Sequence, residues 1–460
     1  MTGRLSTLCC LVPALLIVIG FAAGCDERSQ REGPAEVRET VAAQGPAQIQ
    51  PAAQPTRTIV WISVDGIRPD YLDRATLPNM HRWIAEGALS REFVPVFPSL
   101  TFSSHVSKAT GATVNAHGIP SNSFIDRTDW RVHRYPWSAQ LLDAEPIWTT
   151  ATRQGLRVIS QDWPLSHEQR GEHATAYHGE RFPRGLSGSE RMALVSDSWN
   201  EDVRLAEQTA DGRAPIRLAL GYMEGPDSPG HSYGPDAEEP IRALEVADGQ
   251  LGVFMAEVIR LWELHRAAHD ELYLIITTDH GMSDVHTLVN LNYLAGILDD
   301  QQVAAITSGN VGHIFVRGEY GSEEHETRVD AIVAKINEQP FASAYRRADL
   351  PPEWGYDHPT RTGDVVAVID TGYTFSGRPR EMRAPVTDFD GPLGMHGYDP
   401  ATNPEMNGIM LMWRYPEPLG GIDLGRVHSL QMHATVAELL GIEPAETARR
   451  DAIELPWLQK

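Results

Sequence analysis

Three short apolar segments constrain the fold of this chain more than any other feature of its sequence. Each has the length of a strand and stops at a turn that carries acidic residues. Near-continuous apolar segments of this length suit strands that are buried on both faces of a parallel sheet, because helices cover each face. The segments are 58–64, followed by Asp65-Gly66; 218–222, followed by 224–227; and 272–278, followed by Asp279-His280-Gly281.

Helical patterns separate these segments. Alternating strands and helices predict an α/β sandwich around a mostly parallel sheet, with ligands bound at the carboxyl ends of the strands. A further strand is expected at 408–413, and the less regular residues from about 300 to 390 are expected to form a smaller insert or cap. The helices are expected at roughly 78–87, 101–110, 196–210, 237–266 and 427–441.

The N-terminus predicts an exported protein. A basic start, an apolar segment at 8–23 and small residues before a cleavage site describe a secretory signal, and the segment is short for a membrane-spanning helix. Cys25 follows Ala22-Ala23-Gly24 as in a bacterial lipoprotein signal, so residues 1–25 are interpreted as a signal peptide ending at a lipidated Cys25 that anchors the chain to a membrane. A plain secretory signal with an incidental cysteine is the alternative. Either signal predicts a periplasmic or cell-surface location.

Composition separates a tether from a folded part and limits the partners. Residues 26–56 are rich in Ala, Gln, Pro and Glu and are expected to be a disordered tether, so the folded domain is expected at 57–450. The formal net charge of -23 argues against binding to a nucleic-acid duplex, which needs clustered Lys and Arg. All three cysteines precede residue 26, so any zinc in the folded part must be held by His and Asp.

Six side chains at strand ends or in Gly-rich loops could hold metal ions. Carboxylate oxygens combined with imidazole nitrogens suit zinc, and two metals can clamp the attacking and leaving oxygens of a phosphoryl displacement. Taken singly, each has an ordinary alternative: a turn aspartate, a solvated pair, or a hydrogen-bonded structural histidine. Pro229 and Gly230 are also expected to rule out a regular helix that carries Asp227 and His231 on one face. The six are Asp65, Asp227, His231, Asp279, His280 and His396.

Thr101 is the candidate nucleophile. It follows a Pro-containing loop and opens an apolar-periodic helix. Metal coordination can turn an alcohol into an alkoxide, and a helix N-terminus adds positive potential for an incoming phosphate. The alternative is that Thr101 is only a helix N-cap.

At these residues the sequence closely resembles the nucleotide pyrophosphatase/phosphodiesterase family, also called type I phosphodiesterases, of the alkaline phosphatase superfamily. The resemblance runs from about 58 to 443 and includes several motifs in the family's order. It implies an alkaline-phosphatase-like three-layer αβα sandwich over 57–450. The motifs include Val64-Asp65-Gly66, 98–105, 116–119 with Asn122, 145–148, Trp163-Pro164, 224–235, 278–282, 345–347, 363–365, Gly372-Tyr373 and 394–399.

The resemblance also implies roles for individual residues. One zinc would be held by Asp65, Asp279 and His280 together with the Thr101 oxygen. The other zinc would be held by Asp227, His231 and His396. Asn122 would donate a hydrogen bond to a phosphate oxygen; without the family it would be interpreted as a turn residue. Phe102 matches a position that stacks on a nucleotide base in relatives, with core packing as the alternative, and Phe182 is the expected stacking partner of Phe102.

The predicted activity is hydrolysis of phosphodiester or pyrophosphate bonds, in nucleotides or related small phosphate esters, with two zinc ions (Zn²⁺). A covalent phospho-threonine intermediate forms on Thr101 and water then releases it. Two alternatives stay open. A phosphomonoesterase or phosphonate hydrolase could use the same site, and an inactive envelope lipoprotein could merely bind phosphate. Relatives usually have Pro-Asn in place of Ser103-Ser104 and Asn in place of Pro400, which leaves the shape of the pocket and the choice of substrate open.

Overall fold

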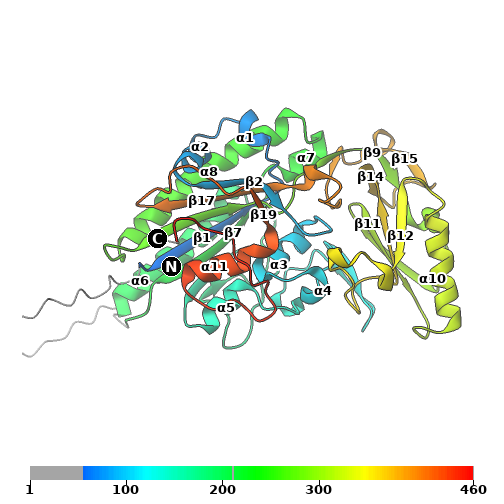
Figure 1. Ribbon diagram of the computed structural model, residues 1–460, viewed down its shortest axis with the longest axis horizontal. Coiled ribbons are helices and arrows are strands. Elements are labelled where there is room, and N and C mark those ends of the chain that lie inside the picture. The colour runs from blue at the N-terminus through cyan, green and yellow to red at the C-terminus, as the bar shows by residue number, and fades with distance from the viewer. Residues whose placement is uncertain (1–54, 210–211, 459–460) are drawn as a thin grey trace, which may run out of the picture. The chain divides into compact units, whose positions relative to one another are not determined.

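A nine-stranded sheet forms the centre of the structure, a computed structural model that describes residues 55–209 and 212–458. Its order is β18-β2-β17-β8-β1-β7-β5-β6, with β19 beside β2. Figure 1 labels β1, β2, β7, β17 and β19 of this sheet. Strands β8, β1, β7, β5 and β6 are mutually parallel, whereas β17 runs antiparallel to both β8 and β2. The strands are β1 (Arg57–Val64), β2 (Ala88–Val94), β5 (Arg157–Ser160), β6 (Tyr177–His178), β7 (Ile216–Met223), β8 (Glu271–Thr277), β17 (Gly408–Tyr415), β18 (Ile422–Asp423) and β19 (Arg426–His428).

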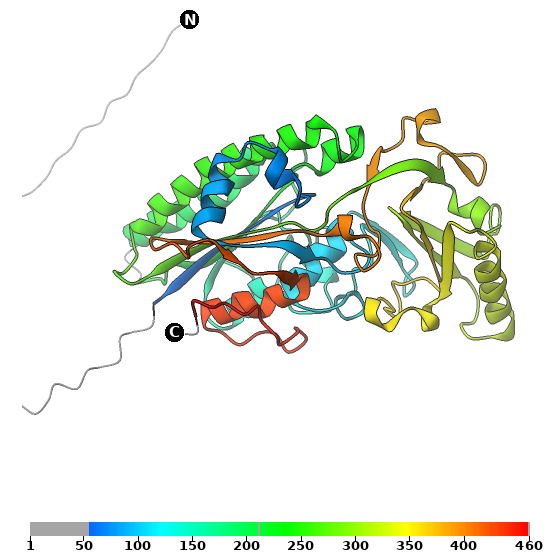
Figure 2. The same cartoon turned by 45° about the horizontal axis from the view of Figure 1, so that its top comes forward.

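Helices cover both faces of this sheet (Figures 1 and 2). Val60 and Ile62 of β1 pack in one hydrophobic cluster with helices α2, α6 and α8, whereas Ile59 and Trp61 pack in another with α3, α5 and α11. Alternate residues of a strand point to opposite faces, so an unbroken apolar segment is what a doubly covered strand requires. The helices are α2 (Pro78–Glu86), α3 (Thr101–Thr110), α5 (Ile147–Arg153), α6 (Gly188–Thr209), α8 (Glu238–Glu263) and α11 (Met432–Leu440).

The predicted fold class, an αβα sandwich around a mostly parallel sheet, is confirmed, while two helix boundaries differ from the expectation. Helix α6 begins at Gly188 because the Glu190 carboxylate and the Ser187 hydroxyl and backbone form hydrogen bonds around its polar first turn, which carries no apolar periodicity. Helix α11 begins at Met432 because the preceding residues form β19 and a 3₁₀ turn.

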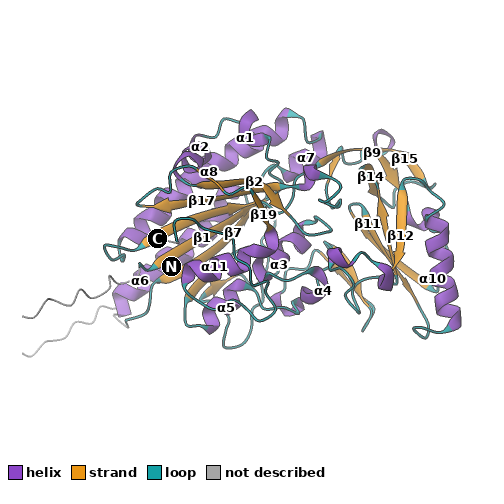
Figure 3. Ribbon diagram, in the orientation of Figure 1, coloured by secondary structure: helices purple, strands orange, loops and turns teal. Residues whose placement is uncertain are grey.

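Residues between β8 and β17 form smaller sheets beside the central one (Figure 3). One has the order β10-β11-β13-β12 and packs against helix α10; the other has the order β14-β9-β15, with β16 also paired to β9. Strand β16 ends one residue before His396, so its pairing with β9 fixes that histidine. The elements are β9 (Ser283–Val289), β10 (Val303–Ser308), β11 (Val311–Val316), α10 (Glu323–Ile336), β12 (Ala342–Arg346), β13 (Val365–Ile369), β14 (Gly372–Phe375), β15 (Arg383–Pro385) and β16 (Gly394–Met395).

Short elements complete the described chain. Strands β3 (Ser123–Asp126) and β4 (Arg131–Arg134) form a hairpin directly after Asn122. No helix of the described residues combines the length and the apolar character needed to cross a bilayer. The predicted signal peptide at 1–25, including Cys25, and nearly all of the predicted tether at 26–56 lie outside the described residues. The short helices are α1 (Tyr71–Arg74), α4 (Val114–His117), α7 (Asp227–Tyr233) and α9 (Leu291–Leu294), and the 3₁₀ turns are Ala139–Leu141, Arg347–Asp349, Pro352–Trp354, Val386–Asp388, Pro404–Met406 and Ser429–Gln431.

Candidate active site

Sheet topology brings the three predicted aspartates to one edge. Strands β7, β1 and β8 are neighbours and parallel, so their carboxyl ends lie side by side. Asp65 directly follows β1, Asp279 lies two residues after β8, and Asp227 begins helix α7 after β7. This edge is where an open α/β sheet binds its ligands.

Gly66 allows the turn after β1 to lie against the start of helix α7. A Cβ built on Gly66 would lie 2.9 Å from both the Cα and the Cβ of Asp227, and Gly66 has a φ of +75°, which side chains rarely adopt. Its backbone N–H also donates to Asp279 Oδ1 at 3.2 Å. One glycine therefore holds the three acidic turns together.

Asp227 and His231 share a face of helix α7, contrary to the expectation that Pro229 and Gly230 exclude a regular helix. Pro229 is the third residue of α7, and the first four N–H groups of a helix have no partner within the helix. A proline there breaks no hydrogen bond. The two side chains lie four residues apart, with His231 Nε2 at 3.3 Å from Asp227 Oδ1.

Three histidines of the site are oriented in the same way, with Nδ1 against the backbone and Nε2 free. Each Nδ1 lies within hydrogen-bond distance of a backbone carbonyl oxygen: His231 of Gly394 at 2.7 Å, His280 of Gly281 at 2.9 Å, and His396 of Ser99 at 3.0 Å. An Nδ1–H that donates to a carbonyl leaves the Nε2 lone pair free, and this is the arrangement in which histidine binds metals.

Three carboxylate oxygens converge with these nitrogens. Asp65 Oδ1, Asp279 Oδ2 and Asp227 Oδ1 are buried and accept no hydrogen bond from the described residues. A buried carboxylate oxygen without a donor is costly, and a cation would satisfy it. Two overlapping sets have potential ligand atoms within 4.8 Å of one another: Asp65, Asp279 and His280, and Asp227, His280 and His396.

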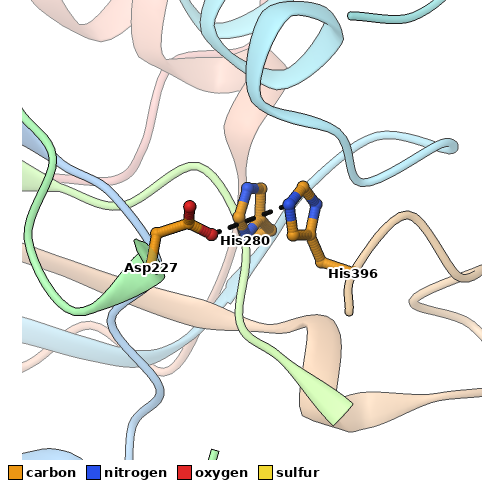
Figure 4. Close-up of side chains that lie close together, drawn as sticks. All are labelled: Asp227, His280 and His396. Atoms are coloured by element: carbon orange, nitrogen blue, oxygen red, sulfur yellow. Dashed lines mark ion pairs between the residues drawn. The ribbon is translucent and has the colours of Figure 1, made fainter. Parts of the chain in front are cut away.

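His280 belongs to both sets. Its ring stacks on that of His396 at 3.4 Å between centroids, and Asp227 Oδ1 lies 3.6 Å from His396 Nε2 (Figure 4). The ring centroids of His231 and His396 are 5.1 Å apart, so the sixth predicted ligand is within reach of the second set. All six predicted ligands are thus brought together.

Electrostatics of the cluster reflect crowded negative charge. Burial, together with the charges of Asp279 and Asp227, raises the pKa of Asp65 well above its usual value. Burial alone would lower the pKa of His231, but the neighbouring Asp227 carboxylate outweighs it and raises the pKa to about 9. Packed carboxylates of this kind favour a bound cation.

Thr101 is the first residue of α3, and Leu100 occupies the N-cap position, so the threonine hydroxyl does not cap the helix. Its Oγ1 lies 3.3 Å from His280 Nε2. The backbone N–H of Phe102 donates to Asn122 Oδ1 at 3.0 Å, which fixes the amide of Asn122 beside the helix start. The hydroxyl, the amide and the helix N-terminus therefore surround one position at the carboxylate cluster.

Aromatic side chains line the approach to Thr101. Phe102 is 2% exposed and meets Trp137 edge to face at 5.2 Å, and it meets Tyr135 at 5.9 Å. Phe182 stacks on Trp137 at 3.5 Å and 9°, rather than on Phe102. The indole ring thus connects the two predicted stacking residues.

Sequence reasoning missed several residues of the site. Tyr222 donates its hydroxyl to Asp65 Oδ2 at 2.7 Å, and Lys108 and His105 are fully buried behind the cluster. Lys108 Nζ donates to Ser63 Oγ at 2.7 Å and to the Thr278 carbonyl at 3.0 Å. The available signal was a lysine within the otherwise apolar and small helix 101–110.

The fold is an alkaline-phosphatase-like αβα sandwich, and the candidate reacting groups lie at the carboxyl edge of its sheet. The sequence model of the type I phosphodiesterase / nucleotide pyrophosphatase family matches residues 59–399, so the chain belongs to this family. Members hydrolyse phosphodiester or pyrophosphate bonds, and this protein is accordingly a hydrolase of that kind.

Curated relatives and solved structures agree. The chain is 27% identical to the bis(5'-adenosyl)-triphosphatase ENPP4 of Bos taurus, over 85% of this chain and 80% of that protein. It is 26% identical to ectonucleotide pyrophosphatase/phosphodiesterase family member 7 of Rattus norvegicus, over 90% of this chain and 89% of that protein. The structure of human ectonucleotide pyrophosphatase/phosphodiesterase 5 has a TM-score of 0.69 and 24% identity, covering 87% of this chain and 98% of that one, and supports the fold.

Proposed function

We propose that this protein is a two-zinc phosphodiesterase or nucleotide pyrophosphatase that uses Thr101 as its covalent nucleophile. The observation that carries the proposal is the set of three buried carboxylate oxygens without donors, facing histidines whose Nδ1 atoms lie against backbone carbonyls. Three oxygens and three nitrogens fit two zinc ions and leave positions open for substrate. Asp65, Asp279 and His280 would hold one ion, and Asp227, His231 and His396 the other.

Zinc bound there would lower the pKa of the threonine hydroxyl and neutralise charge on the phosphate oxygens. In the first step Thr101 Oγ1 attacks phosphorus, a new P–O bond forms, and the ester or anhydride P–O bond to the leaving group breaks. Asn122 is positioned to donate its Nδ2–H to a non-bridging phosphate oxygen as charge develops there. In the second step water attacks the phospho-threonine, which releases the phosphate product and restores the hydroxyl.

The proposed substrates are phosphodiester or pyrophosphate compounds of nucleotides or related small esters. One relative's name, bis(5'-adenosyl)-triphosphatase, makes a dinucleoside triphosphate a specific candidate. A mono-anionic diester also suits the site better than a monoester, because the nearest buried ammonium group, Lys108, is committed to Ser63 and Thr278.

The test compares wild-type protein with Thr101→Ala and Thr101→Ser on bis(p-nitrophenyl) phosphate, with and without a chelator. Thr101→Ala and the chelator are each expected to lower kcat at least about 10³-fold, while Thr101→Ser keeps part of the activity. In wild type that is quenched rapidly during turnover of this diester, the peptide that contains Thr101 should gain the mass of a p-nitrophenyl phosphoryl group, because only one nitrophenolate leaves in the first step. Unchanged hydrolysis in both Thr101→Ala and chelator-treated protein would contradict the proposal.

We also propose that the protein is exported and tethered to a membrane through lipid on Cys25. Support comes only from the sequence pattern of residues 1–25, which lie outside the described residues. In a bacterial host, wild type is expected in the membrane fraction with incorporated palmitate, and Cys25→Ala is expected to lose the label. Equal labelling of both forms would rule the anchor out.

A further inference from the structure

Beside the aromatic approach to Thr101 lies a pocket of about 670 Å³ with a concentration of positive charge. A volume of this size is in the range of small-molecule sites. Four arginines line it, and the Trp137–Phe182 stack contributes to its wall. The arginines are Arg131, Arg134, Arg181 and Arg184.

None of the four guanidinium groups forms an ion pair with a residue of the described ranges, and all four residues are exposed. Two glutamates also line the pocket, but the Glu180 carboxylate is occupied by Arg170, with Nη2 at 2.8 Å from Oε2. Among the described residues that line the pocket, Glu168 is the only other carboxylate near the four arginines. In a chain with a net charge of -23, a local excess of uncompensated arginine is unusual.

Trp137, in the wall of the pocket, contacts two residues of the candidate active site. Trp137 meets Phe102, the residue after the nucleophile, at 5.2 Å, and it meets Tyr222, whose hydroxyl donates to Asp65, at 6.3 Å. On the other side, Arg134 ends strand β4 opposite Ser123, and the next residue's N–H donates to the Asn122 carbonyl at 2.8 Å. The hairpin that follows Asn122 therefore presents Arg131 and Arg134, while Arg181 and Arg184 come from the loop between β6 and α6.

We propose that this arginine pocket binds a second phosphate group of the substrate, separate from the phosphate attacked by Thr101. Guanidinium groups bind phosphate oxygens in forked pairs, and four of them suit the charge of a polyphosphate chain. The proposal rests on the proposed function and specifies its substrate class: diesters and anhydrides that carry a further phosphate, such as dinucleoside polyphosphates. A substrate with a single phosphate gains nothing from the pocket.

The experiment measures kcat/KM for two substrates in double variants. Diadenosine triphosphate carries further phosphates, whereas bis(p-nitrophenyl) phosphate carries only the one that is attacked. Arg131→Gln/Arg134→Gln and Arg181→Gln/Arg184→Gln are each expected to lower kcat/KM for the first substrate about tenfold or more, and to change the second less than about twofold. The loss should shrink as salt rises, because screening weakens exposed charge pairs. The matched control is Arg450→Gln, an exposed arginine away from the pocket.

The variant Arg131→Lys/Arg134→Lys keeps the positive charge and changes the shape of the side chains. It is expected to recover most of the preference for the triphosphate that the glutamine variant loses. Equal losses on both substrates, or no loss on either, would overturn the proposal. Inorganic pyrophosphate added as a competitor distinguishes a site for free phosphate: if it inhibits both substrates equally and only through these arginines, the pocket serves a free anion and not the substrate.

A binding measurement keeps this test independent of turnover. Titration calorimetry of diadenosine triphosphate into Thr101→Ala protein loaded with zinc should show a Kd about tenfold weaker in either double variant than in Thr101→Ala alone. If wild type fails to hydrolyse either substrate but this difference in Kd persists, the proposed function fails and the phosphate pocket stands. If hydrolysis is robust and the Kd values coincide, the pocket is wrong and the proposed function stands.

Discussion

Lys108 places a cation where an amphipathic helix pattern predicts a small or apolar residue. Its side chain is fully buried, and burial lowers the pKa of its amine to about 7, against the opposing influence of Asp279 and Asp65. Hydrogen bonds to Ser63 and Thr278 fix the amine behind the carboxylate cluster. Lys108 therefore offsets part of the negative charge of the cluster when no metal is bound.

We predict that Lys108→Met lowers the stability of the metal-free protein by about 3 kcal/mol, because three buried carboxylates lose a compensating cation. The loss should be smaller in zinc-loaded protein, since the bound ions replace that charge. Differential scanning calorimetry with and without zinc measures the effect: zinc should raise the Tm of Lys108→Met more than it raises the Tm of wild type. Lys335→Met, at a half-exposed helix position paired with Glu338, is the control and should leave that rise unchanged. An equal drop in both forms would show that Lys108 acts through packing alone.

At the same scale, the sequence predicted some residues of the site and not others. Asp65, Asp227 and Asp279 follow apolar segments, and the ends of parallel strands meet, so their proximity could be derived from the pattern. His396 follows no such strand and was a candidate only as a histidine in a Gly-rich loop, and Asn122 entered the prediction through the family resemblance alone. Contacts such as Tyr222 on Asp65 depend on which side chains of neighbouring strands share a face, which the pattern alone leaves undetermined.

Among the elements, the turn after β8 shows how little space the site leaves. A Cβ on Gly281 would lie 1.9 Å from the Glu405 carbonyl oxygen, and the Gly281 N–H donates to the Met406 carbonyl at 2.8 Å. His280 is the preceding residue. The close approach of these two backbone segments therefore helps to fix the direction of a predicted zinc ligand.

We predict that Gly281→Ala lowers the free energy of unfolding by about 1–3 kcal/mol and reduces zinc content, because the two backbones must separate. Gly249→Ala is the matched substitution: Gly249 is exposed in helix α8 and has no atom within 4 Å of the added Cβ. It should raise stability by about 0.5–1 kcal/mol, since alanine favours helix. Urea unfolding and metal analysis of the purified variants measure both effects. Comparable stability in the two variants would contradict the expected clash.

The main helices and strands were predictable because their apolar periodicity reflects burial, as in β1 and α8. Short elements were not. A regular helix at α7 was not expected because Pro229 and Gly230 lie within it. The expectation was wrong because Pro229 lies in the first turn, where a proline breaks no hydrogen bond of the helix. The β3–β4 hairpin, which supplies Arg131 and Arg134, carries polar residues on an exposed strand and shows no pattern to detect.

For the whole molecule, burial of neutral histidines makes stability dependent on pH. His313 is held by the Tyr356 hydroxyl at its Nε2 and the Gly363 N–H at its Nδ1, and burial lowers its pKa from 6.5 to about 3. Unfolding at intermediate pH then takes up a proton. The stability from this group is complete above about pH 6.5 and is lost as the pH falls toward 3.

We predict that the protein loses about 2 kcal/mol of stability between pH 8 and pH 5 through His313 alone. The reason is that pH 5 lies about 1.5 units below the pKa of this histidine in the unfolded chain, and each unit costs about 1.4 kcal/mol. His313→Gln, which keeps a donor toward Tyr356, should reduce the difference between urea unfolding at the two pH values by that amount. His269→Gln, at an exposed position, should leave the difference unchanged. A pH dependence identical in wild type and His313→Gln would show that this histidine is not responsible.

Strand β16 belongs to the smaller sheets by its pairing with β9, yet the residue that follows it, His396, reaches Ser99 and Asp227 at the edge of the central sheet. A shortened chain that deletes residues 300–390 would therefore keep every strand of the central sheet but lose β14 and β15, the strands that pair with β9 and so support its pairing with β16. The region is thus required for the position of His396 and is not a dispensable insertion. Natural variants of this architecture should vary its surface loops freely while retaining its attachment to that histidine.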